Sequence, residues 1–360
     1  MRDARETRLR LLRSANIGPV TYRHLIARFG TAEAALDALP MLAARGGGRA
    51  PIIADAGSVR REIAAVEKLG ARYLFLDEPE YPTLLAETEG APPALILRGR
   101  LELAGRTCVA MVGARNASAA ACRFARQLAL GLGDQGFTVV SGLARGIDTA
   151  AHVGSLGGGT IGVIASGIDL AYPPENAELQ ERIAREGLLV AEQPPGTEPL
   201  ARFFPSRNRI IAGLATGTVV VEAAPRSGSL ITARMAAEAG REVMAVPGSP
   251  IDPRAQGCNL LIREGATLVQ SVDDILEAIR PIDSRGVRSP ASGFEGPPPV
   301  DASNADRRAI VGLLGPVPVA VDELIRQSGL VPAVVQTVLL ELELAGRLER
   351  HAGGRASLVG

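Results

Sequence analysis

The chain has 360 residues, of which 46% are hydrophobic, 39 are basic and 39 are acidic. This length and apolar content are enough for two or three domains, each with a sizeable core. Because the formal charge is zero, the sequence excludes a strong electrostatic field over the whole molecule, and any affinity for nucleic acid must come from a local basic patch.

The cysteines argue against a disulfide framework or a zinc site. Cys108, Cys122 and Cys258 lie far apart, make an odd number and form no C-x-x-C pair. We therefore predict no metal and no other cofactor. The N-terminus has no apolar signal segment, and no apolar run reaches the roughly 18 residues of a membrane span, so we expect a cytoplasmic protein with no membrane span.

Residues 1–100 are predicted to form an N-terminal helical domain that ends in a connector. Apolar residues recur at helical spacing, and the pattern is interrupted at Ile17-Gly18-Pro19 and at Gly30-Thr31. The first of these turns resembles a helix-hairpin-helix (HhH) or sterile-alpha-motif (SAM)-like module, whose amides can touch a DNA phosphate. We favour packing or a partner contact over direct DNA contact for this turn. Two short strands are expected in the connector, near 73–76 and 95–97.

Residues 101–280 alternate between short apolar strands, glycine-rich turns and helices. Short apolar strands separated by helices indicate a parallel sheet that is covered on both faces. The predicted fold class is therefore α/β, a Rossmann-like doubly wound parallel sheet whose ligands lie beyond the carboxyl ends of the strands. The expected strands are 108–112, 137–141, 160–165, 188–191, 218–222 and 242–246, with helices such as 119–132 and 230–239 between them.

The last part of the chain is predicted to be a linker and a separate small domain. Residues 281–305 are rich in proline, glycine and serine and cannot bury a core. Residues 306–360 have the pattern of a winged-helix domain, in which three helices are followed by a hairpin. The helices are expected at 309–314, 322–327 and 334–345, and the hairpin at 347–358.

The expected recognition helix of the winged-helix domain, Pro332–Ala345, contains no lysine or arginine. Its glutamates would repel phosphates, and only Arg347, Arg350 and Arg355 in the wing could help to bind a duplex. We therefore favour a protein contact or a regulatory role over duplex binding for this domain.

The turns that follow the expected strands carry the residues of a candidate anion site. Strand one runs into Gly113-Ala114-Arg115, strand two into Ser141–Asp148 and strand five into Glu222–Ser229. Glycines at these places let backbone amides approach a phosphate, and Ser118 and Ser229 are placed to cap the helices that follow. Because such turns end several strands and carry arginines, we predict an anion cradle at this edge of the sheet.

The segment Arg202–Leu214 is the strongest candidate for the rest of this site. It combines three arginines and an asparagine with an apolar helical run, and the helix is expected to begin near Ser206. The arginine fork matches phosphate oxygens, while a helix N-terminus adds free N–H groups and the positive end of the helix dipole. Phe203 or Phe204 could stack on a base, with core packing as the alternative.

The sequence argues against common catalytic and nucleotide motifs. Gly113-Ala114-Arg115 does not match G-x-G-x-x-G, which disfavours NAD, and the absence of G-x-x-x-x-G-K-[ST] excludes P-loop hydrolysis. The histidines His24, His152 and His351 fall in different regions and form no set with a serine or cysteine nucleophile. We interpret His152 as a packing or capping residue, and we predict no catalytic residue and no enzymatic activity.

Several long motifs in order resemble those of the DNA-processing protein A (DprA, also called Smf) family. They cover most of residues 107–280, and the two outer domains resemble accessory domains of that family. The motifs in this chain are Val112-Gly113-Ala114-Arg115, Ser141-Gly142-Leu143-Ala144-Arg145-Gly146-Ile147-Asp148, Phe204-Pro205-Ser206-Arg207-Asn208-Arg209-Ile210-Ile211-Ala212-Gly213-Leu214, Glu222-Ala223, Ser227-Gly228-Ser229-Leu230-Ile231-Thr232-Ala233, Ala245-Val246-Pro247-Gly248 and Gly257-Cys258-Asn259.

This resemblance implies single-stranded DNA binding in a basic pocket of the sheet domain, homodimerisation, and loading of the RecA recombinase on incoming single strands during natural transformation. Within the pocket, the chain offers arginine where many members of the family have a lysine, which favours bidentate phosphate contact. The DNA-binding residues carried over onto this sequence are Gly113, Ala114, Arg115, Ser141, Gly142, Gly146, Phe204, Arg207, Asn208 and Arg209.

An alternative function is that of a nucleoside-monophosphate phosphoribohydrolase, since such lysine-decarboxylase-like enzymes use the same type of sheet scaffold. Those enzymes carry P-G-G-x-G-T-x-x-E with a catalytic glutamate. In this chain the comparable segment, Arg226–Thr232, has Thr232 in place of that acid. The missing acid argues against hydrolysis.

Overall fold

The computed structural model describes residues 2–49, 51–88, 90–279, 301–351 and 353–359. It contains two compact units. The sheet unit is Glu62–Ser284, and the terminal unit combines Met1–Arg61 with Arg285–Gly360. Most of the expected linker, residues 281–300, lies outside the described residues.

The sheet unit is built on a nine-stranded sheet with the strand order β1-β2-β6-β5-β4-β3-β7-β8-β9. All six predicted strands are present. The two short strands expected in the connector also join this sheet, as β1 and β2. The strands are β1 (Arg72–Phe75), β2 (Ala94–Gly99), β3 (Cys108–Gly113), β4 (Thr138–Ser141), β5 (Thr160–Gly167), β6 (Leu188–Gln193), β7 (Gly217–Val221), β8 (Glu242–Ala245) and β9 (Thr267–Leu268).

The strands from β3 to β9 pair in parallel, and β1 and β2 form an antiparallel edge next to β6. The prediction of a mostly parallel, Rossmann-like sheet is therefore confirmed. The chain proceeds from β3 through β4 and β5 to β6 in one direction and then returns to the other side of β3 with β7. In open α/β sheets, ligands bind beyond the carboxyl ends of the strands at such a reversal.

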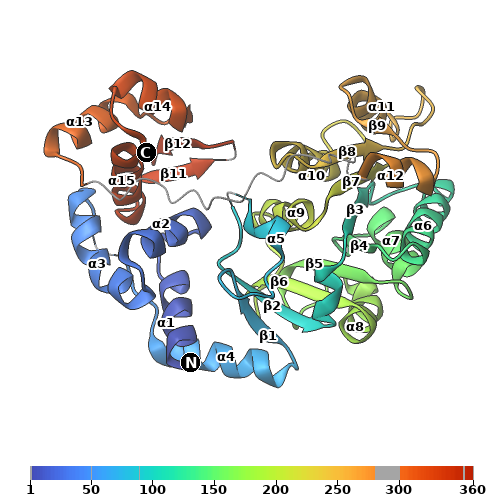
Figure 1. The fold of residues 1–360 in the computed structure, drawn as a ribbon, viewed down its shortest axis with the longest axis horizontal. Coiled ribbons are helices and arrows are strands. Elements are labelled where there is room, and N and C mark those ends of the chain that lie inside the picture. The colour runs from blue at the N-terminus through green and yellow to red at the C-terminus, as the bar shows by residue number, and fades with distance from the viewer. Residues whose placement is uncertain (1, 50, 89, 280–300, 352, 360) are drawn as a thin grey trace, which may run out of the picture. The chain divides into compact units, whose positions relative to one another are not determined.

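Helices cover both faces of this sheet (Figure 1). Along β3, Cys108, Ala110 and Val112 pack on the side of α9 and α10, while Val109 and Met111 pack on the side of α6 and α7. Burial on both faces explains why the strands are continuously apolar. The helices of the unit are α5 (Thr83–Ala86), α6 (Ala119–Asp134), α7 (Ile147–Ser155), α8 (Ala177–Glu186), α9 (Phe203–Leu214), α10 (Gly228–Glu238), α11 (Gln256–Arg263) and α12 (Val272–Ile279), with short 3₁₀ turns η1 (Leu101–Gly105) and η2 (Pro174–Asn176).

The N-terminal part of the terminal unit is helical, as predicted. Local signals fix the junction between its second and third helices, because Gly30 ends α2 with φ +75° and Thr31 caps α3 by accepting the Ala34 N–H at 3.2 Å. The helices are α1 (Arg2–Arg13), α2 (Pro19–Phe29) and α3 (Ala32–Arg45), with α4 (Ala56–Lys68) at the boundary of the two units.

The C-terminal part of the terminal unit has the predicted winged-helix architecture. Ser303 and Asp306 form a capping box at the start of its first helix. The hairpin strands β11 and β12 and one extra short strand, β10, form a three-stranded sheet with the order β10-β12-β11. The elements are α13 (Asn304–Leu313), β10 (Val319–Ala320), α14 (Val321–Ser328), α15 (Pro332–Leu344), β11 (Leu348–His351) and β12 (Arg355–Leu358).

The expected recognition helix, α15, is buried between the two parts of the terminal unit. Leu340 and Leu344 complete the apolar core of the N-terminal helices, while Val335 and Leu339 pack in the winged-helix core. In addition, the Asn16 amide donates to the Leu344 carbonyl at 3.3 Å. Most of this helix is therefore covered by the chain itself, and only its first residues, such as Pro332, are exposed. A protein contact or a regulatory role of the winged-helix domain stays a prediction.

The hairpin turn Ile17-Gly18-Pro19 lies beside the winged-helix hairpin and borders a cavity of about 600 Å³. Glu343, Glu349 and Arg350 line the same cavity, and Arg350 pairs with Glu343 at 2.8 Å. Packing or a partner contact as the role of this turn stays a prediction.

Acidification should weaken the terminal unit through His24. Burial, with Arg350 and Arg23, lowers the pKa of His24 from 6.5 to about 4. The unfolded chain therefore takes up a proton below about pH 6.5 that the folded chain takes up only near pH 4. The free energy of unfolding is therefore highest above pH 6.5. It falls by up to about 3 kcal/mol as the pH falls to 4.

Urea unfolding followed by circular dichroism at about pH 7 and about pH 4.5 measures this effect. His24→Gln should show a smaller loss of stability between the two pH values than the unmodified chain. The pKa of His152, in the sheet unit, is also lowered, and His152→Gln is the matched control for that unit. Equal losses in His24→Gln and the unmodified chain would contradict the assignment to His24.

Candidate functional site

The turns after β3 and β4 are packed backbone against backbone. A Cβ atom at Gly113 would collide with the Val221 carbonyl oxygen, and one at Gly146 would collide with the Ala114 carbonyl oxygen. The Ile147 N–H donates to the same Ala114 oxygen at 3.2 Å. Glycine is therefore required at both positions, and Gly146 also has φ +74°. This packing places the turn that carries Arg115 next to the start of α7.

Arg207 lies on Gly142, so the two segments meet although they are far apart in the sequence. A Cβ atom at Gly142 would overlap with the Arg207 guanidinium. Arg207 is only 8% exposed, and its Nη1 donates to Asn208 Oδ1 at 3.2 Å. Within the described part of the chain, its Nε has no hydrogen-bond partner. Burying a guanidinium N–H without a hydrogen-bond partner is costly.

Asp148 provides a buried negative charge close to this guanidinium. Its Oδ2 accepts the N–H groups of Gly142 and Ala144 at 3.1 and 3.3 Å, which holds the turn after β4 in shape. Burial raises the pKa of Asp148, and the charge of Arg207 acts in the opposite direction. Burial likewise lowers the pKa of Arg207. The sequence pattern includes Asp148 in a motif but does not indicate this role.

Phe204 connects the two arginines of the site. The Arg115 and Arg207 guanidinium carbons lie 5.4 and 5.8 Å from the centre of its ring. Such cation–π contacts fix both guanidinium groups near one point. Phe203, by contrast, packs under Arg202, at 4.9 Å. Of the two phenylalanines, Phe204 therefore lies in the cluster, which we call the Arg115–Arg207 cluster and define as Arg115, Gly142, Phe204 and Arg207.

Tyr172 is an aromatic neighbour that the sequence did not single out. Its ring meets the Phe204 ring edge to face, with centres 5.8 Å apart and an angle of 65°. The side chain is 45% exposed and is therefore open to a ligand. It lies in the loop after β5, at the edge of the sheet where ligands were expected. This position is the only feature of the sequence that indicates a role for Tyr172 in the site.

Asn208 and Arg209 have structural partners. Asn208 is buried and its Nδ2 donates to the Gly228 carbonyl at 3.4 Å, which links α9 to α10. Arg209 donates to the Gly90 carbonyl and forms an ion pair with Glu192 on β6. Residues two positions apart on a helix are separated by about 200° around its axis, so Arg207 and Arg209 point in nearly opposite directions. The structure does not bring Arg209 to the cluster.

Ser141 also acts inside the sheet. It is fully buried, and its hydroxyl donates to the Met111 carbonyl at 2.6 Å, so it ties β4 to β3. Its side chain is consequently not presented to a ligand.

The helix starts differ in part from those expected. Ser118 caps α6 as predicted and accepts the Ala121 N–H at 3.1 Å. The prediction that Ser229 caps the next helix is wrong, because Ser227 occupies the N-cap of α10. Helix α9 begins at Phe203 instead of Ser206, which places Arg207 in the second turn and not at the free N–H groups. Phosphate contact by Arg207 must therefore rest on its side chain.

The histidine near the site is a packing residue. His152 on α7 is fully buried, and its Nδ1 lies 2.7 Å from Thr160 Oγ1. Burial lowers the pKa of His152 to about 3, so the ring stays neutral. Among the described residues, no group of three or more His, Cys, Asp or Glu side chains is arranged to hold a metal, and no helix is long and apolar enough to cross a membrane.

Curated proteins with similar sequences carry the names Smf and DprA. The chain is 36% identical to Protein Smf of Synechocystis sp. over 315 residues, which covers 79% of each protein. It is 48% identical to DNA processing protein DprA of Streptococcus pneumoniae over 198 residues, which covers 54% of this chain and 70% of that protein.

Two solved structures share the fold. The X-ray structure of DprA from Streptococcus pneumoniae matches with a TM-score of 0.59 and 42% identity, over 62% of this chain and 78% of that one. A structure of DNA processing protein A from Helicobacter pylori, described for its single-stranded DNA binding mode, matches with a TM-score of 0.52 and 26% identity, over 57% of this chain and 94% of that one.

Family models cover nearly the whole chain. A DprA-like N-terminal HHH domain matches residues 2–65, and a DprA winged helix domain matches 295–354. The model described as DNA recombination-mediator protein A matches residues 72–280, which contain the entire Arg115–Arg207 cluster. The chain therefore belongs to the DNA recombination-mediator protein A family, whose members are also called DprA or Smf.

Proposed function

We propose that the Arg115–Arg207 cluster binds the backbone of single-stranded DNA and that the chain acts there as a recombination mediator. The observation that carries this proposal is the pair formed by the buried Arg207 guanidinium, whose Nε has no partner among the described residues, and the exposed Arg115, at the reversal point of the sheet. Guanidinium forks match phosphate oxygens, and both groups are held by one ring. The related protein of Helicobacter pylori is described as binding single-stranded DNA.

The proposed site is narrower than the set expected from the sequence. Arg115, Arg207 and Phe204 are its side chains, and the turns at Gly113–Ala114 and at Gly142–Gly146 provide its backbone. Ser141, Asn208 and Arg209 support these groups through their bonds to Met111, Gly228 and Glu192.

Fluorescence anisotropy with labelled single-stranded and double-stranded oligonucleotides over a salt series tests the proposal. A flexible strand can bring successive phosphates to two fixed guanidinium groups, which a stiff duplex cannot do as easily. We expect tighter binding of the single strand with little dependence on base sequence. Equal affinity for both forms at physiological salt would contradict the proposal.

Tyr172 should contribute by stacking on a base. Tyr172 is 45% exposed, and its T-shaped contact with Phe204 holds the ring in place. Tyr172→Ala should weaken single-strand binding about tenfold, since stacking contributes roughly 1–3 kcal/mol per base, whereas Tyr172→Phe should bind nearly normally. The same anisotropy titration measures both variants. An equal loss in Tyr172→Phe would indicate that the hydroxyl acts instead of the ring.

The biological role that follows is protection of incoming single strands and loading of RecA on them during natural transformation, by a homodimer. This role rests on membership of the family and on the proposed strand binding. Its test is RecA filament formation on a strand covered by a single-strand-binding protein. The chain should accelerate filament formation, and Arg115→Ala should lose this acceleration. Sedimentation of the chain at several concentrations tests the homodimer.

The observations do not favour the alternative of a phosphoribohydrolase. Thr232 stands where such an enzyme has its acid, and it is 1% exposed. Glu222, which directly follows β7, accepts the backbone N–H and the hydroxyl of Ser118 at 2.8 and 2.6 Å and serves as a structural acceptor. We accordingly assign no catalytic residue. Release of a free base from AMP in proportion to the amount of protein would reverse this assignment.

A further inference from the structure

An exposed ion pair between Arg145 and Glu175 lies beside the Arg115–Arg207 cluster. Arg145 belongs to the turn after β4, the same turn that carries Gly142. Glu175 belongs to η2, which follows the loop of Tyr172. Neither charged side chain is part of the strand site proposed for the cluster, although both come from its supporting segments.

Two contacts bring Arg145 close to the cluster. A Cβ atom at Gly146, its neighbour in the chain, would lie 2.8 Å from the Arg115 carbonyl oxygen, so the two turns touch. The bond and charge of Glu175 raise the pKa of Arg145, and Tyr172 adds to this effect, which places the Tyr172 hydroxyl near the guanidinium. Arg145 is therefore connected to the cluster through one backbone contact and one aromatic neighbour.

The backbone under the pair is fixed by a buried asparagine. Asn176, next to Glu175, is 7% exposed, and its Nδ2 donates to the Leu143 carbonyl at 2.8 Å and to Thr149 Oγ1 at 3.0 Å. These bonds join η2 to the turn that carries Arg145 and to the start of α7. Because they do not involve the ion pair, removing either of its charges should leave the backbone in place.

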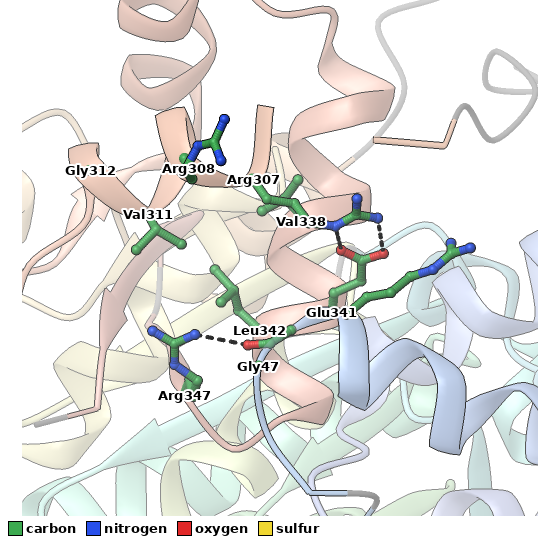
Figure 2. Close-up of a pocket in the computed structure, with 11 residues that line it drawn as sticks. Gly47, Arg307, Arg308, Val311, Gly312, Val338, Glu341, Leu342 and Arg347 are labelled. Carbon is green, nitrogen blue, oxygen red and sulfur yellow. Dashed lines mark hydrogen bonds and ion pairs between the residues drawn. The ribbon is translucent and has the colours of Figure 1, made fainter. Parts of the chain in front are cut away.

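The exposure of the pair allows a ligand to replace its carboxylate. The Arg145 and Glu175 side chains are 62% and 49% exposed, and exposed ion pairs contribute little to stability. The pair of Arg307 and Glu341 in the terminal unit is a contrast, because Glu341 is fully buried and cannot be exchanged (Figure 2). A phosphate offers oxygens that a guanidinium binds as it binds a carboxylate.

Glu175 opposes the approach of a strand in two ways. The hydrogen bond from Arg145 lowers the pKa of Glu175, so the carboxylate is charged at neutral pH. It occupies the guanidinium of Arg145, and its charge repels phosphates nearby. The first effect depends on Arg145 and the second does not, so mutations can separate them.

We propose that Arg145 is a third phosphate ligand of single-stranded DNA, beside Arg115 and Arg207, and that Glu175 competes with the strand for it. In the free chain Arg145 holds Glu175, and in the complex it holds a phosphate. The competition lowers the affinity for the strand and thereby eases its release. This inference rests on the function proposed for the cluster, because it adds one phosphate contact to the same site.

The test measures binding of a labelled oligothymidylate to the full chain by fluorescence anisotropy over a salt series. Glu175→Gln should bind about threefold more tightly than the unmodified chain, because Arg145 is no longer occupied by a carboxylate. Arg145→Ala should bind about fivefold more weakly, and its salt slope should be lower by about 0.7. Glu186→Gln is the matched control and should bind normally, since it removes a similarly exposed, arginine-paired carboxylate from the far end of α8.

The double variant Arg145→Ala with Glu175→Gln separates competition from simple repulsion. If Glu175 competes for Arg145, replacing Glu175 should increase the affinity much less in the Arg145→Ala background than in the unmodified chain. An equal increase in both backgrounds overturns the inference. Normal affinity and salt slope in Arg145→Ala also overturn it.

Arg207→Ala in the same titration distinguishes failure of this inference from failure of the proposed function. If Arg207→Ala weakens binding while Arg145→Ala and Glu175→Gln leave it unchanged, only the roles of Arg145 and Glu175 are wrong. If the unmodified chain does not bind the strand, both proposals are wrong.

Discussion

Replacing Arg207 with alanine should reduce the affinity for single-stranded DNA at least tenfold. The guanidinium is almost fully buried on Gly142 and is held by Phe204, so it can meet a phosphate with little loss of side-chain entropy. Arg115→Ala should have a similar effect, because Arg115 contacts the same ring from the exposed side. Each change should lower the salt slope of binding by about 0.7 on single strands.

A double-mutant cycle tests whether the two arginines act together. Both contact Phe204, and the charge of Arg115 lowers the pKa of Arg207. Their effects on binding should therefore be non-additive by about 0.5 kcal/mol or more. Arg355→Ala, in the terminal unit, is the control and should leave the salt slope unchanged. The cluster is not the binding site if Arg115→Ala and Arg207→Ala both retain the original affinity and slope.

The effect of Arg207→Ala on folding must be separated from its effect on binding. Removing the guanidinium leaves Asp148 buried without its nearby positive charge, which destabilises the sheet unit. Since burial already raises the pKa of Asp148, this cost should be largest at neutral pH and should shrink as the pH falls through that raised pKa. The double variant Arg207→Ala with Asp148→Asn should regain stability but not DNA binding. Recovery of both properties would mean that the loss of binding came from misfolding.

The sequence predicted the sheet well because its strands are buried on both faces. Their continuous apolar runs, such as Cys108–Val112, differ clearly from the helices between them. The helix was expected to begin near Ser206, one residue after Pro205, whereas α9 begins at Phe203 and contains Pro205 in its first turn. A proline can also occupy the third position, since the N–H groups of the first turn have no partner within the helix.

The site was predicted only in part, because the direction of a side chain depends on packing that no motif specifies. Helical periodicity could have separated Arg209 from Arg207, which are two positions apart. The role proposed for Tyr172 depends on a contact with Phe204, over 30 residues away in the chain, and the sequence around Tyr172 does not indicate that contact.

The sequence of α15 indicates that the helix is buried, but it does not indicate which part of the chain covers it. Val335, Leu339, Leu340 and Leu344 lie on more than one side of the helix, which indicates apolar packing on more than one side. On one side it is covered by α1, α2 and α3, which lie near the other end of the chain. Contacts over such a sequence distance cannot be inferred from one helix.

Replacing Arg307 with alanine should cost the terminal unit about 3–5 kcal/mol of stability. Glu341 is fully buried on α15, and Arg307 is its only charged partner among the described residues. Without the guanidinium, the carboxylate must stay charged in an apolar site or take up a proton, and both are unfavourable at neutral pH. Because α15 also completes the core of the N-terminal helices, both parts of the unit should lose stability together.

The comparison with an exposed ion pair makes this prediction specific. Arg326 and Glu323 on α14 form a pair whose side chains are 72% and 35% exposed, so Arg326→Ala should cost less than about 1 kcal/mol. Replacing both buried partners, as Arg307→Met with Glu341→Leu, should recover much of the loss. The chain has no tryptophan, so urea unfolding should be followed by hydrogen exchange of peptides from α1–α3 and α13–α15. If Arg307→Ala costs no more than Arg326→Ala, water reaches Glu341 in the folded chain, and the buried pair does not hold the terminal unit together.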